Sequence, residues 1–256
     1  MAELLTKKKI VVVGAGGLLG AQVVKGILKS GGEVIALDIN VAAMKERFVS
    51  VGIAISEENI HTEELNINDS RMLSEFWENV ENVSGAVNCT YPRNATYGGN
   101  FFDVTLDSFN ENINLHLGSA FLFSQQCAKY FMRNDSSFAL VNVSSVYGVI
   151  APKFEIYDGT SMTMPVEYAV IKSAILHLNK YICAYVKNSK FRINSISPGG
   201  LIDSQPEEFI QAYKEQTNGT GMLKAEDMVE SVIYLLSDSS KYVTGQNIVI
   251  DDGFTI

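Results

Sequence analysis

The sequence predicts an α/β protein with one doubly wound parallel sheet of about seven strands and helices on both faces. Short β-branched runs alternate with segments whose apolar residues recur at helical spacing. The first run, KKKIVVVG, passes directly into a glycine-rich turn. The 256 residues are 46% hydrophobic and 19% charged, so they can bury one large core. No linker or repeat interrupts them, and residues 1–256 are predicted to form a single domain.

The first half of the chain is predicted to contain four strands and three helices. After the strand KKKIVVVG, a helix runs from Gly17 to Ser30, where SGG ends it. EVIALD is the second strand and VAAMKERF a helix, and ENIHTEELN is a polar third strand. After a helix in SRMLSEFWENV, GAVN forms the fourth strand. Strict alternation of this kind favours right-handed parallel crossovers.

The second half begins with one long predicted helix from Leu106 to Met132. FALVNVSS is the fifth strand and ends in hydroxyl side chains. A long loop from Val146 to Pro165 then precedes a helix in YAVIKSAILHLNKYICAYV. RINSIS and QNIVI are the sixth and seventh strands, separated by two short helices. The last predicted strand of the sheet, QNIVI, therefore lies near the end of the sequence.

Charge and composition exclude several function classes. The net charge of −9 argues against a nucleic-acid groove but permits an anionic small substrate in a local pocket. No apolar run reaches the ~18 residues that cross a bilayer, and the N-terminus has no signal-peptide pattern, so we expect a cytoplasmic protein without a membrane partner. The cysteines Cys89, Cys127 and Cys183 have no redox spacing and are predicted to be buried thiols. Neither they nor the histidines His61, His116 and His177 have metal-ligand spacing, so we predict no metal site.

The turn GAGGLLG, between the first strand and first helix, is a candidate phosphate loop. In a doubly wound sheet this turn lies outside the carboxyl ends of the strands, where free helix N–H groups favour a pyrophosphate. The strict G-x-G-x-x-G pattern fails at Leu19, and a tight turn without a ligand is the alternative. The predicted cofactor-binding residues in this turn are Gly14, Gly16, Gly17, Leu18, Leu19 and Gly20.

Asp38 ends the second strand, where an acidic side chain can accept hydrogen bonds from the hydroxyls of an adenosine ribose. It would repel a 2′-phosphate, and no Arg or Lys lies in the glycine turn or directly after Asp38 to compensate. NAD is therefore predicted in preference to NADP. The alternative is that Asp38 only caps the following helix.

The order of motifs along nearly the whole chain resembles the short-chain dehydrogenase/reductase family. Besides the glycine turn and Asp38, the motifs are VN at Val87–Asn88, NVSS at Asn142–Ser145, YAVIK, and SPGG at Ser197–Gly200, with TGQNIVIDDG similar to the family's closing strand. The resemblance implies a Rossmann-type fold, an NAD cofactor and a homodimer or homotetramer. It places further cofactor contacts at Ile39, Asn66, Ile67, Asn88, Cys89, Tyr168, Lys172, Pro198, Gly199 and Leu201.

Tyr168 and Lys172 are the predicted proton-transfer pair, although a single Tyr-x-x-x-Lys match is weak by itself. Residues i and i+4 lie on one helix face, and an ammonium close to a phenol lowers its pKa. By the resemblance, Lys172 also binds the nicotinamide ribose, Tyr168 exchanges a proton with the reacting oxygen, and Ser145 orients that oxygen. Ser144 is then structural.

Four departures from the family pattern concern the predicted site. Leu18 replaces the middle glycine of the loop. NCTYPR replaces the family's NNAG, and its Arg93 either binds an anionic substrate or is a solvated arginine. His116 takes the place of the catalytic asparagine, as a proton relay that titrates near neutrality or as a core residue.

The fourth departure is the length of the loop between Ser145 and Tyr168. It is predicted to bind a polar substrate through Tyr157, with Lys153, Asp158 and Thr160 as further candidates; the alternative is a floppy surface insertion. The segment LIDSQPEEFIQAY resembles the family's lid, with Asp203 or Ser204 in place of its usual threonine.

Among members of this family, NLHLGSAFLFSQ, YAVIKSAILHLNKY and SPGGLIDSQPE are most similar to those of bacterial surface-sugar and flagellin-modification pathways. The resemblance implies an NAD-dependent oxidoreductase that interconverts an alcohol and a ketone, acting on a sugar, sugar phosphate or nucleotide sugar. Two alternatives stay open. One is a non-catalytic NAD(H)-binding sensor or scaffold, and the other is a carbonyl or acyl reductase.

Overall fold

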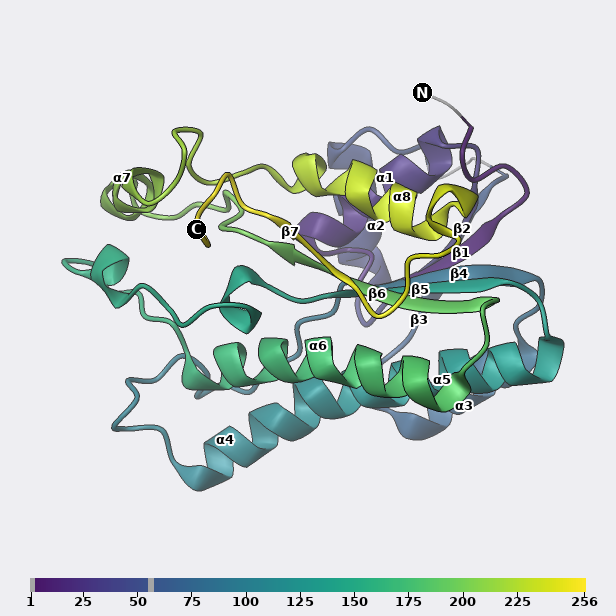
Figure 1. The fold of residues 1–256 in the computed structure, drawn as a ribbon, viewed down its shortest axis with the longest axis horizontal. Coiled ribbons are helices and arrows are strands. Elements are labelled where there is room, and N and C mark those ends of the chain that lie inside the picture. Colours follow the sequence, from purple (N-terminus) through teal and green to yellow (C-terminus); the bar gives the residue numbers. More distant parts are fainter. Residues whose placement is uncertain (1–2, 55–57) are drawn as a thin grey trace.

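The computed structural model describes residues 3–54 and 58–256. A seven-stranded sheet with the order β3-β2-β1-β4-β5-β6-β7 is parallel throughout. Its strands are β1 (Lys9–Val13), β2 (Glu33–Asp38), β3 (Ile60–Glu64), β4 (Val83–Asn88), β5 (Phe138–Val143), β6 (Phe191–Pro198) and β7 (Asn247–Ile250). The predicted fold class is confirmed, since every expected strand forms and helices cover both faces (Figure 1).

The helices divide between the two faces of the sheet. One layer holds α1 (Leu18–Lys29), α2 (Val41–Ser50) and α8 (Val229–Leu236); the other holds α3 (Ser70–Asn79), α5 (Ser119–Asn134) and α6 (Val166–Val186) (Figure 1). The remaining helical segments are α4 (Leu106–Asn112), α7 (Glu207–Glu215), the π-helix η1 (Ile113–Gly118) and four short 3₁₀ turns, η2 (Val146–Gly148), η3 (Phe154–Tyr157), η4 (Ala225–Met228) and η5 (Asp238–Ser240). No helix among the described residues is both long enough and apolar enough to span a bilayer.

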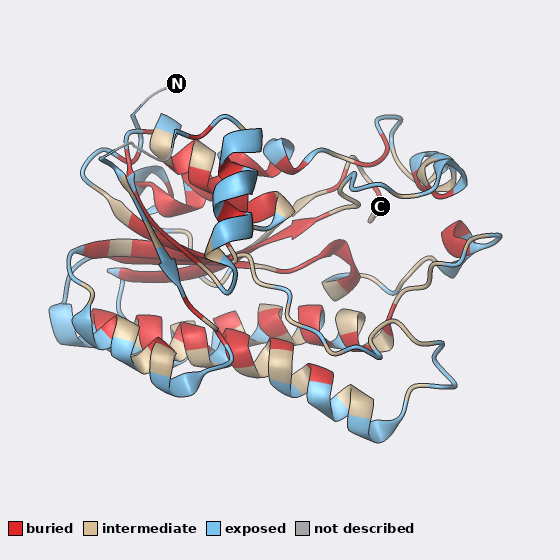
Figure 2. Ribbon diagram, turned by 180° about the vertical axis from the view of Figure 1, so that it is seen from behind, coloured by how far each residue is buried: buried red, intermediate tan, exposed pale blue. Residues whose placement is uncertain are grey.

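Two hydrophobic clusters bury the faces of the sheet (Figure 2). Alternate residues of β1 serve opposite faces, because side chains alternate along a strand. Ile10 and Val12 pack with α1, α2 and α8, whereas Val11 and Val13 pack with α3, α5 and α6. The central strands are therefore buried on both sides, as their continuous apolar runs predict.

The predicted helix from Leu106 to Met132 is continuous but not uniform. It comprises α4, η1 and α5, and the π-helical turn contains His116. A π-helical turn widens the helix by one residue, and such turns occur frequently at functional sites. Periodicity could not predict this turn, because its apolar positions fit an α-helix almost as well.

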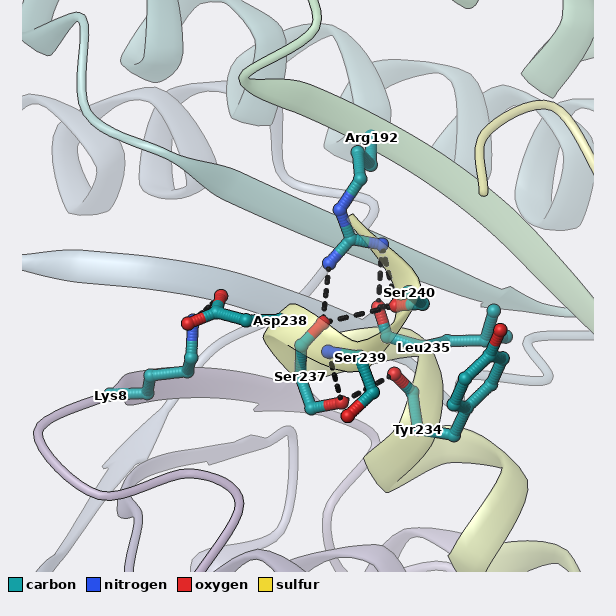
Figure 3. A network of polar contacts seen from close by, with 8 residues as sticks. All are labelled: Lys8, Arg192, Tyr234, Leu235, Ser237, Asp238, Ser239 and Ser240. Carbon is teal, nitrogen blue, oxygen red and sulfur yellow. Dashed lines mark hydrogen bonds and ion pairs between the residues drawn. The ribbon is translucent and has the colours of Figure 1, made fainter. Parts of the chain in front are cut away.

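A buried arginine joins the C-terminal layer to the sheet (Figure 3). Arg192, at the start of β6, donates to the carbonyl of Leu235 at 2.8 Å, the hydroxyl of Ser240 at 3.0 Å and the carbonyl of Ser237 at 3.1 Å. These groups end α8 and form η5, where carbonyls lack partners within the helix. Next to them, Lys8 pairs with Asp238 at 2.7 Å on the surface. The arrangement fixes the end of α8 against β6.

Candidate active site

The carboxyl ends of the strands place most of the predicted site residues along one edge of the sheet. The chain reverses its direction of winding between β1 and β4, which are neighbours in the sheet. Val13 is in register with Leu37 on one side and with Asn88 on the other. The segments that follow these strands therefore converge at the switch point, where doubly wound folds bind ligands.

The glycine turn after β1 is closely packed. Gly14 has φ +74°, and a Cβ there would lie 3.0 Å from the backbone of Cys89. A Cβ on Gly20 would collide with the carbonyl oxygen of Gly14. α1 begins at Leu18 without a side-chain cap from Gly17, so the turn forms with leucine at the position of the family's middle glycine. The glycines let strand, turn and helix approach closely.

A pocket of about 280 Å³ opens between this turn and the ends of β2 and β4. Seven predicted cofactor-binding residues line it: Gly14, Gly17, Asp38, Ile39, Asn66, Ile67 and Cys89. Leu19 and Gly20 are buried in the core, and Asn88 is buried with its side-chain oxygen accepting from the Thr90 hydroxyl at 2.7 Å. Pro198, Gly199 and Leu201 lie at the end of β6, outside this pocket. A larger hollow, about 430 Å³, lies along β3 and α3 and contains no predicted site residue.

Asp38 does not cap α2, because the N-cap is Asn40, whose side chain accepts from the N–H of Ala43 at 3.0 Å. The Asp38 carboxylate instead accepts from the N–H groups of Gly16 at 2.9 Å and Asn40 at 3.1 Å. It thus joins β2 to the glycine turn at the mouth of the pocket. A carboxylate has further lone pairs available for ribose hydroxyls.

Lys172 and Tyr168 both point to the ends of β5 and β4 from α6. The Lys172 ammonium donates to the carbonyl of Val143 at 2.9 Å and lies 5.5 Å from the centroid of the Tyr168 ring. The Ser144 hydroxyl donates to the carbonyl of Lys172 at 2.8 Å, which ties β5 to α6 and gives Ser144 a structural contact. Ser145 is 4% exposed and accepts from the N–H of Tyr147 at 3.2 Å.

Burial controls the protonation of this pair. It raises the pKa of Tyr168, and hydrogen bonding to Ser145 opposes that rise. The expected net lowering of the Tyr168 pKa is therefore wrong for this arrangement, because desolvation of the phenolate outweighs the effects that favour it. Burial also lowers the pKa of Lys172 to about 8.

His116 is 3% exposed, and its Nε2 lies 3.5 Å from the Lys172 ammonium. Burial and the charge of Lys172 lower its pKa to about 2, so the expected titration near neutrality is wrong. Its Nδ1 is buried without a hydrogen-bond partner. A neutral imidazole can still accept a hydrogen bond from the ammonium at Nε2. Any relay through His116 therefore uses the neutral ring.

Tyr91 occupies the centre of the site, and the sequence marked it only as part of a segment bulkier than the family's NNAG, without a role in catalysis or substrate binding. Its ring lies 5.2 Å from the His116 ring, 5.5 Å from the Tyr168 ring and 5.8 Å from the Lys172 ammonium, centroid distances in each case. Arg93 stacks on the same ring, with its guanidinium carbon 4.9 Å from the centroid. The bulk of NCTYPR where small residues are usual was the available signal.

Glu167, next to Tyr168, is 0% exposed and was also missed. One of its oxygens lies 3.5 Å from the side-chain nitrogen of Asn112, and the other has no partner. Burial is the main cause that raises the pKa values of the Tyr91 and Tyr97 phenols, and the nearby Glu167 adds to it. No sequence signal identifies it, because a glutamate in the first turn of a helix is usually solvated.

The long loop is packed against the lid segment. Ile156 and Tyr157 are buried, and the Tyr157 ring lies 5.1 Å from that of Phe209 in α7. The Tyr157 hydroxyl donates to that of Tyr147 at 3.3 Å. Packing of this kind contradicts the alternative of a floppy insertion for residues 154–157.

The other residues of the loop that were predicted to contact a substrate differ in their exposure and contacts. Asp158 is exposed, and Thr160 donates to the carbonyl of Tyr157 at 2.8 Å. Lys153 lies with its ammonium 4.5 Å from the centroid of the Phe254 ring. Of the lid candidates, Asp203 and Ser204 are both exposed. Within the described residues, no cluster of three or more His, Cys, Asp or Glu side chains could hold a metal ion.

A family model described as enoyl-(acyl carrier protein) reductase matches residues 14–255. The chain is 34% identical to post-translational flagellin modification protein A of Campylobacter coli, over 98% of this chain and 99% of that protein. It is 24% identical to the 7alpha-hydroxysteroid dehydrogenase of Bacteroides fragilis, over 97% and 95%.

Among solved structures, the fold is similar to that of a short chain dehydrogenase from Leptospira borgpetersenii with bound NAD⁺. The TM-score is 0.87 at 29% identity, covering 99% of this chain and 95% of that one. A 4-hydroxyisoleucine dehydrogenase complexed with NADH superposes with a TM-score of 0.80 at 24% identity, over 97% and 98% of the two chains, and supports the fold alone.

Proposed function

The chain belongs to the short-chain dehydrogenase/reductase family, and on that premise we propose that it is an NAD-dependent oxidoreductase that interconverts an alcohol and a ketone. The observation that carries the proposal is the grouping of Tyr168, Lys172 and Ser145 at the carboxyl ends of the strands. A buried lysine beside a tyrosine and a serine suits proton transfer to or from a reacting oxygen.

The residues around the switch point fit the dinucleotide that the family uses. The glycine turn leaves no room for a Cβ at Gly14 or Gly20, and the adjoining pocket is lined by Asp38, Ile39 and Asn66. When bound, the nicotinamide supplies or accepts a hydride. The residues proposed to hold the dinucleotide are Gly14, Gly16, Gly17, Leu18, Leu19, Gly20, Asp38, Ile39, Asn66, Ile67, Asn88, Cys89, Tyr168, Lys172, Pro198, Gly199 and Leu201.

In the proposed reaction each side chain has a distinct task. Tyr168 gives its phenolic proton to the oxygen of a ketone, or takes one from an alcohol, and Ser145 holds that oxygen by a hydrogen bond. Lys172 stabilises the phenolate after proton transfer, since its ammonium is near the ring and anchored to the carbonyl of Val143. His116 accepts from Lys172 through neutral Nε2 and keeps the ammonium in place.

The preference for NAD rests on Asp38, which lies at the mouth of the pocket. Among the described residues, its carboxylate accepts from backbone N–H groups and from no Lys or Arg side chain. The NAD⁺ bound to the related Leptospira enzyme supports it. Exchange of Asp38 for alanine is expected to raise the Michaelis constant for NAD severalfold and to relax discrimination against NADP. Steady-state kinetics with both dinucleotides test this, and unchanged discrimination would refute the assignment.

The proposed substrate is a sugar, sugar phosphate or nucleotide sugar of a surface-glycan or flagellin-glycan pathway. The flagellin-modification relative supports it. Arg93, Tyr157 and Ser145 are the proposed substrate contacts. We propose a homodimer or homotetramer, supported by the exposed aromatics Tyr181 and Tyr185 on α6. The expected cytoplasmic location stays a prediction.

One observation favours a second candidate, a dinucleotide sensor or scaffold without turnover. The Tyr91 ring crowds Tyr168 and Lys172 where small residues are usual. Assays of hydride transfer, followed by NADH absorbance with a panel of sugars and sugar phosphates, distinguish the two. NAD binding without turnover of any alcohol or ketone would favour the sensor. Turnover only of acyl or steroid carbonyls with NADPH would favour a carbonyl or acyl reductase.

A further inference from the structure

Arg93 carries a charge at the edge of the active site that no carboxylate among residues 3–54 and 58–256 pairs with. The residue is exposed on the segment between β4 and α4. Within the described part of the chain, its guanidinium forms no ion pair with a carboxylate. The guanidinium carbon lies 4.9 Å from the centroid of the Tyr91 ring, on which the group stacks. The five N–H donors of this group can therefore serve a ligand.

The Tyr91 platform under Arg93 is itself fixed. Its ring meets the rings of Tyr168 and His116 edge-on, at interplanar angles of 87° and 72°. Its hydroxyl donates to the hydroxyl of Tyr97 at 2.5 Å. The ring cannot turn away without losing these contacts, so it holds one orientation beside Tyr168.

The turn that follows Arg93 is anchored as well. The side chain of Asn112 accepts from the N–H of Asn94 at 3.0 Å and donates to its side-chain oxygen at 3.1 Å. Asn112 is 1% exposed, and Asn94 also donates to Glu111 at 2.6 Å. Both neighbours of the guanidinium, the ring beneath it and the turn after it, are thus held by the protein.

We infer that Arg93 and Tyr91 form an anion subsite beside Tyr168, in which Tyr91 is a specificity-determining residue that holds the guanidinium in place. The inference rests on the proposed alcohol–ketone chemistry and narrows its substrate to one with a phosphate or carboxylate close to the reacting carbon. A guanidinium pairs with either group through two parallel hydrogen bonds. Substrate specificity then depends on a tyrosine in a segment where the family has small residues.

The test uses the full chain saturated with NAD, so that the dinucleotide site is filled, and inorganic phosphate as the probe. Calorimetry is expected to show phosphate binding that R93A weakens roughly tenfold or more, because a charge-assisted pair is lost. Y91L keeps apolar bulk but removes the ring, and should weaken binding roughly two- to fivefold. Y91F keeps the ring and its edge contacts to Tyr168 and His116 and loses only the hydroxyl bond to Tyr97, so it should bind phosphate more tightly than Y91L. R133A is the matched control, since that arginine stacks on Tyr130 at 5.6 Å, at the far end of α5.

Two outcomes overturn the inference: phosphate that does not bind the wild-type protein, and phosphate binding that R93A and R133A weaken equally. The NAD affinity of each variant shows that its fold is intact. Hydride transfer on neutral sugars, without phosphate binding or inhibition, would remove the anion subsite and leave the proposed function standing. Phosphate binding that depends on Arg93, without hydride transfer on any alcohol or ketone, would instead refute the proposed function.

Discussion

Arg192 and Glu167 are both ionisable and both buried, at 7% and 0% exposure, but their hydrogen bonding differs. The Arg192 guanidinium donates to three acceptors that end α8 and form η5 (Figure 3). Glu167 has one long contact to Asn112 and a second oxygen without a partner. His116 Nδ1 and Asn142 Oδ1, also near the ends of β4 and β5, are likewise unpartnered.

Buried polar side chains have two different roles in this protein. A network in which every group is paired stabilises the fold, whereas an unpaired buried group costs free energy and persists where the surroundings require it. Two of the four buried side-chain atoms without a partner among the described residues, His116 Nδ1 and a Glu167 oxygen, belong to the region around Lys172 and Tyr168. The C-terminal network thus serves the fold, and the region around Lys172 serves the proposed chemistry.

The largest expected effect distinguishes the two regions by activity. Exchange of Tyr168 for phenylalanine removes the exchangeable proton and keeps the ring, so the rate of hydride transfer should fall roughly 10²- to 10⁴-fold. The thermal midpoint should not fall. The same exchange at Tyr181, exposed on the same helix, is the control and should leave the rate unchanged. Wild-type turnover by the Tyr168 variant would contradict the proposed mechanism.

The next effect tests the structural region. Exchange of Arg192 for methionine removes the guanidinium donor from two carbonyls and the Ser240 hydroxyl, and should lower the free energy of unfolding by about 3 kcal/mol. The rate per folded molecule should stay constant. Chemical denaturation measures the change. Exchange of Lys8 for methionine breaks only the surface pair with Asp238 and should cost less than about 1 kcal/mol. Equal losses in both variants would contradict the interpretation of the network.

A smaller effect concerns pH. The pKa of Lys172 is lowered to about 8, so its amine is charged below that pH and neutral above it. If the ammonium binds the nicotinamide ribose, the affinity for NAD should decrease severalfold between about pH 7 and pH 9. Calorimetric titration across this range measures it. The same decrease should occur with Lys180 exchanged for methionine, whereas the Lys172→Met variant should bind weakly without this dependence.

The smallest expected effect concerns Glu167 and its contribution to the free energy of unfolding, compared with that of Arg192. Exchange of Glu167 for methionine keeps a similar volume and removes a buried carboxyl group that has a partner at only one oxygen. The free energy of unfolding should therefore stay constant or rise by about 1 kcal/mol. Chemical denaturation beside the Arg192 variant measures the difference. A loss as large as that of the Arg192 variant would show that Glu167 stabilises the fold, and the comparison between the two regions would fail.

Most of the fold could be predicted from local patterns. Short β-branched apolar runs identified the strands and period-3.6 spacing identified the helices, because apolar faces must be buried whatever the partner. Motif order placed Tyr168 and Lys172 on one helix face and Asp38 at a strand end. The π-helical turn at His116 and the packing of Tyr157 on Phe209 were not predictable, since both depend on contacts between segments far apart in the chain.

The sequence by itself determined the alternation of elements, the glycine turn and the identities of the groups that can exchange a proton. Only the tertiary structure decided their environment: the raised pKa of Tyr168, the neutral state of His116, the burial of Glu167 and the position of Tyr91 over the site. The physical reason is that desolvation and side-chain contacts depend on which segments meet in space, and local spacing does not contain that information.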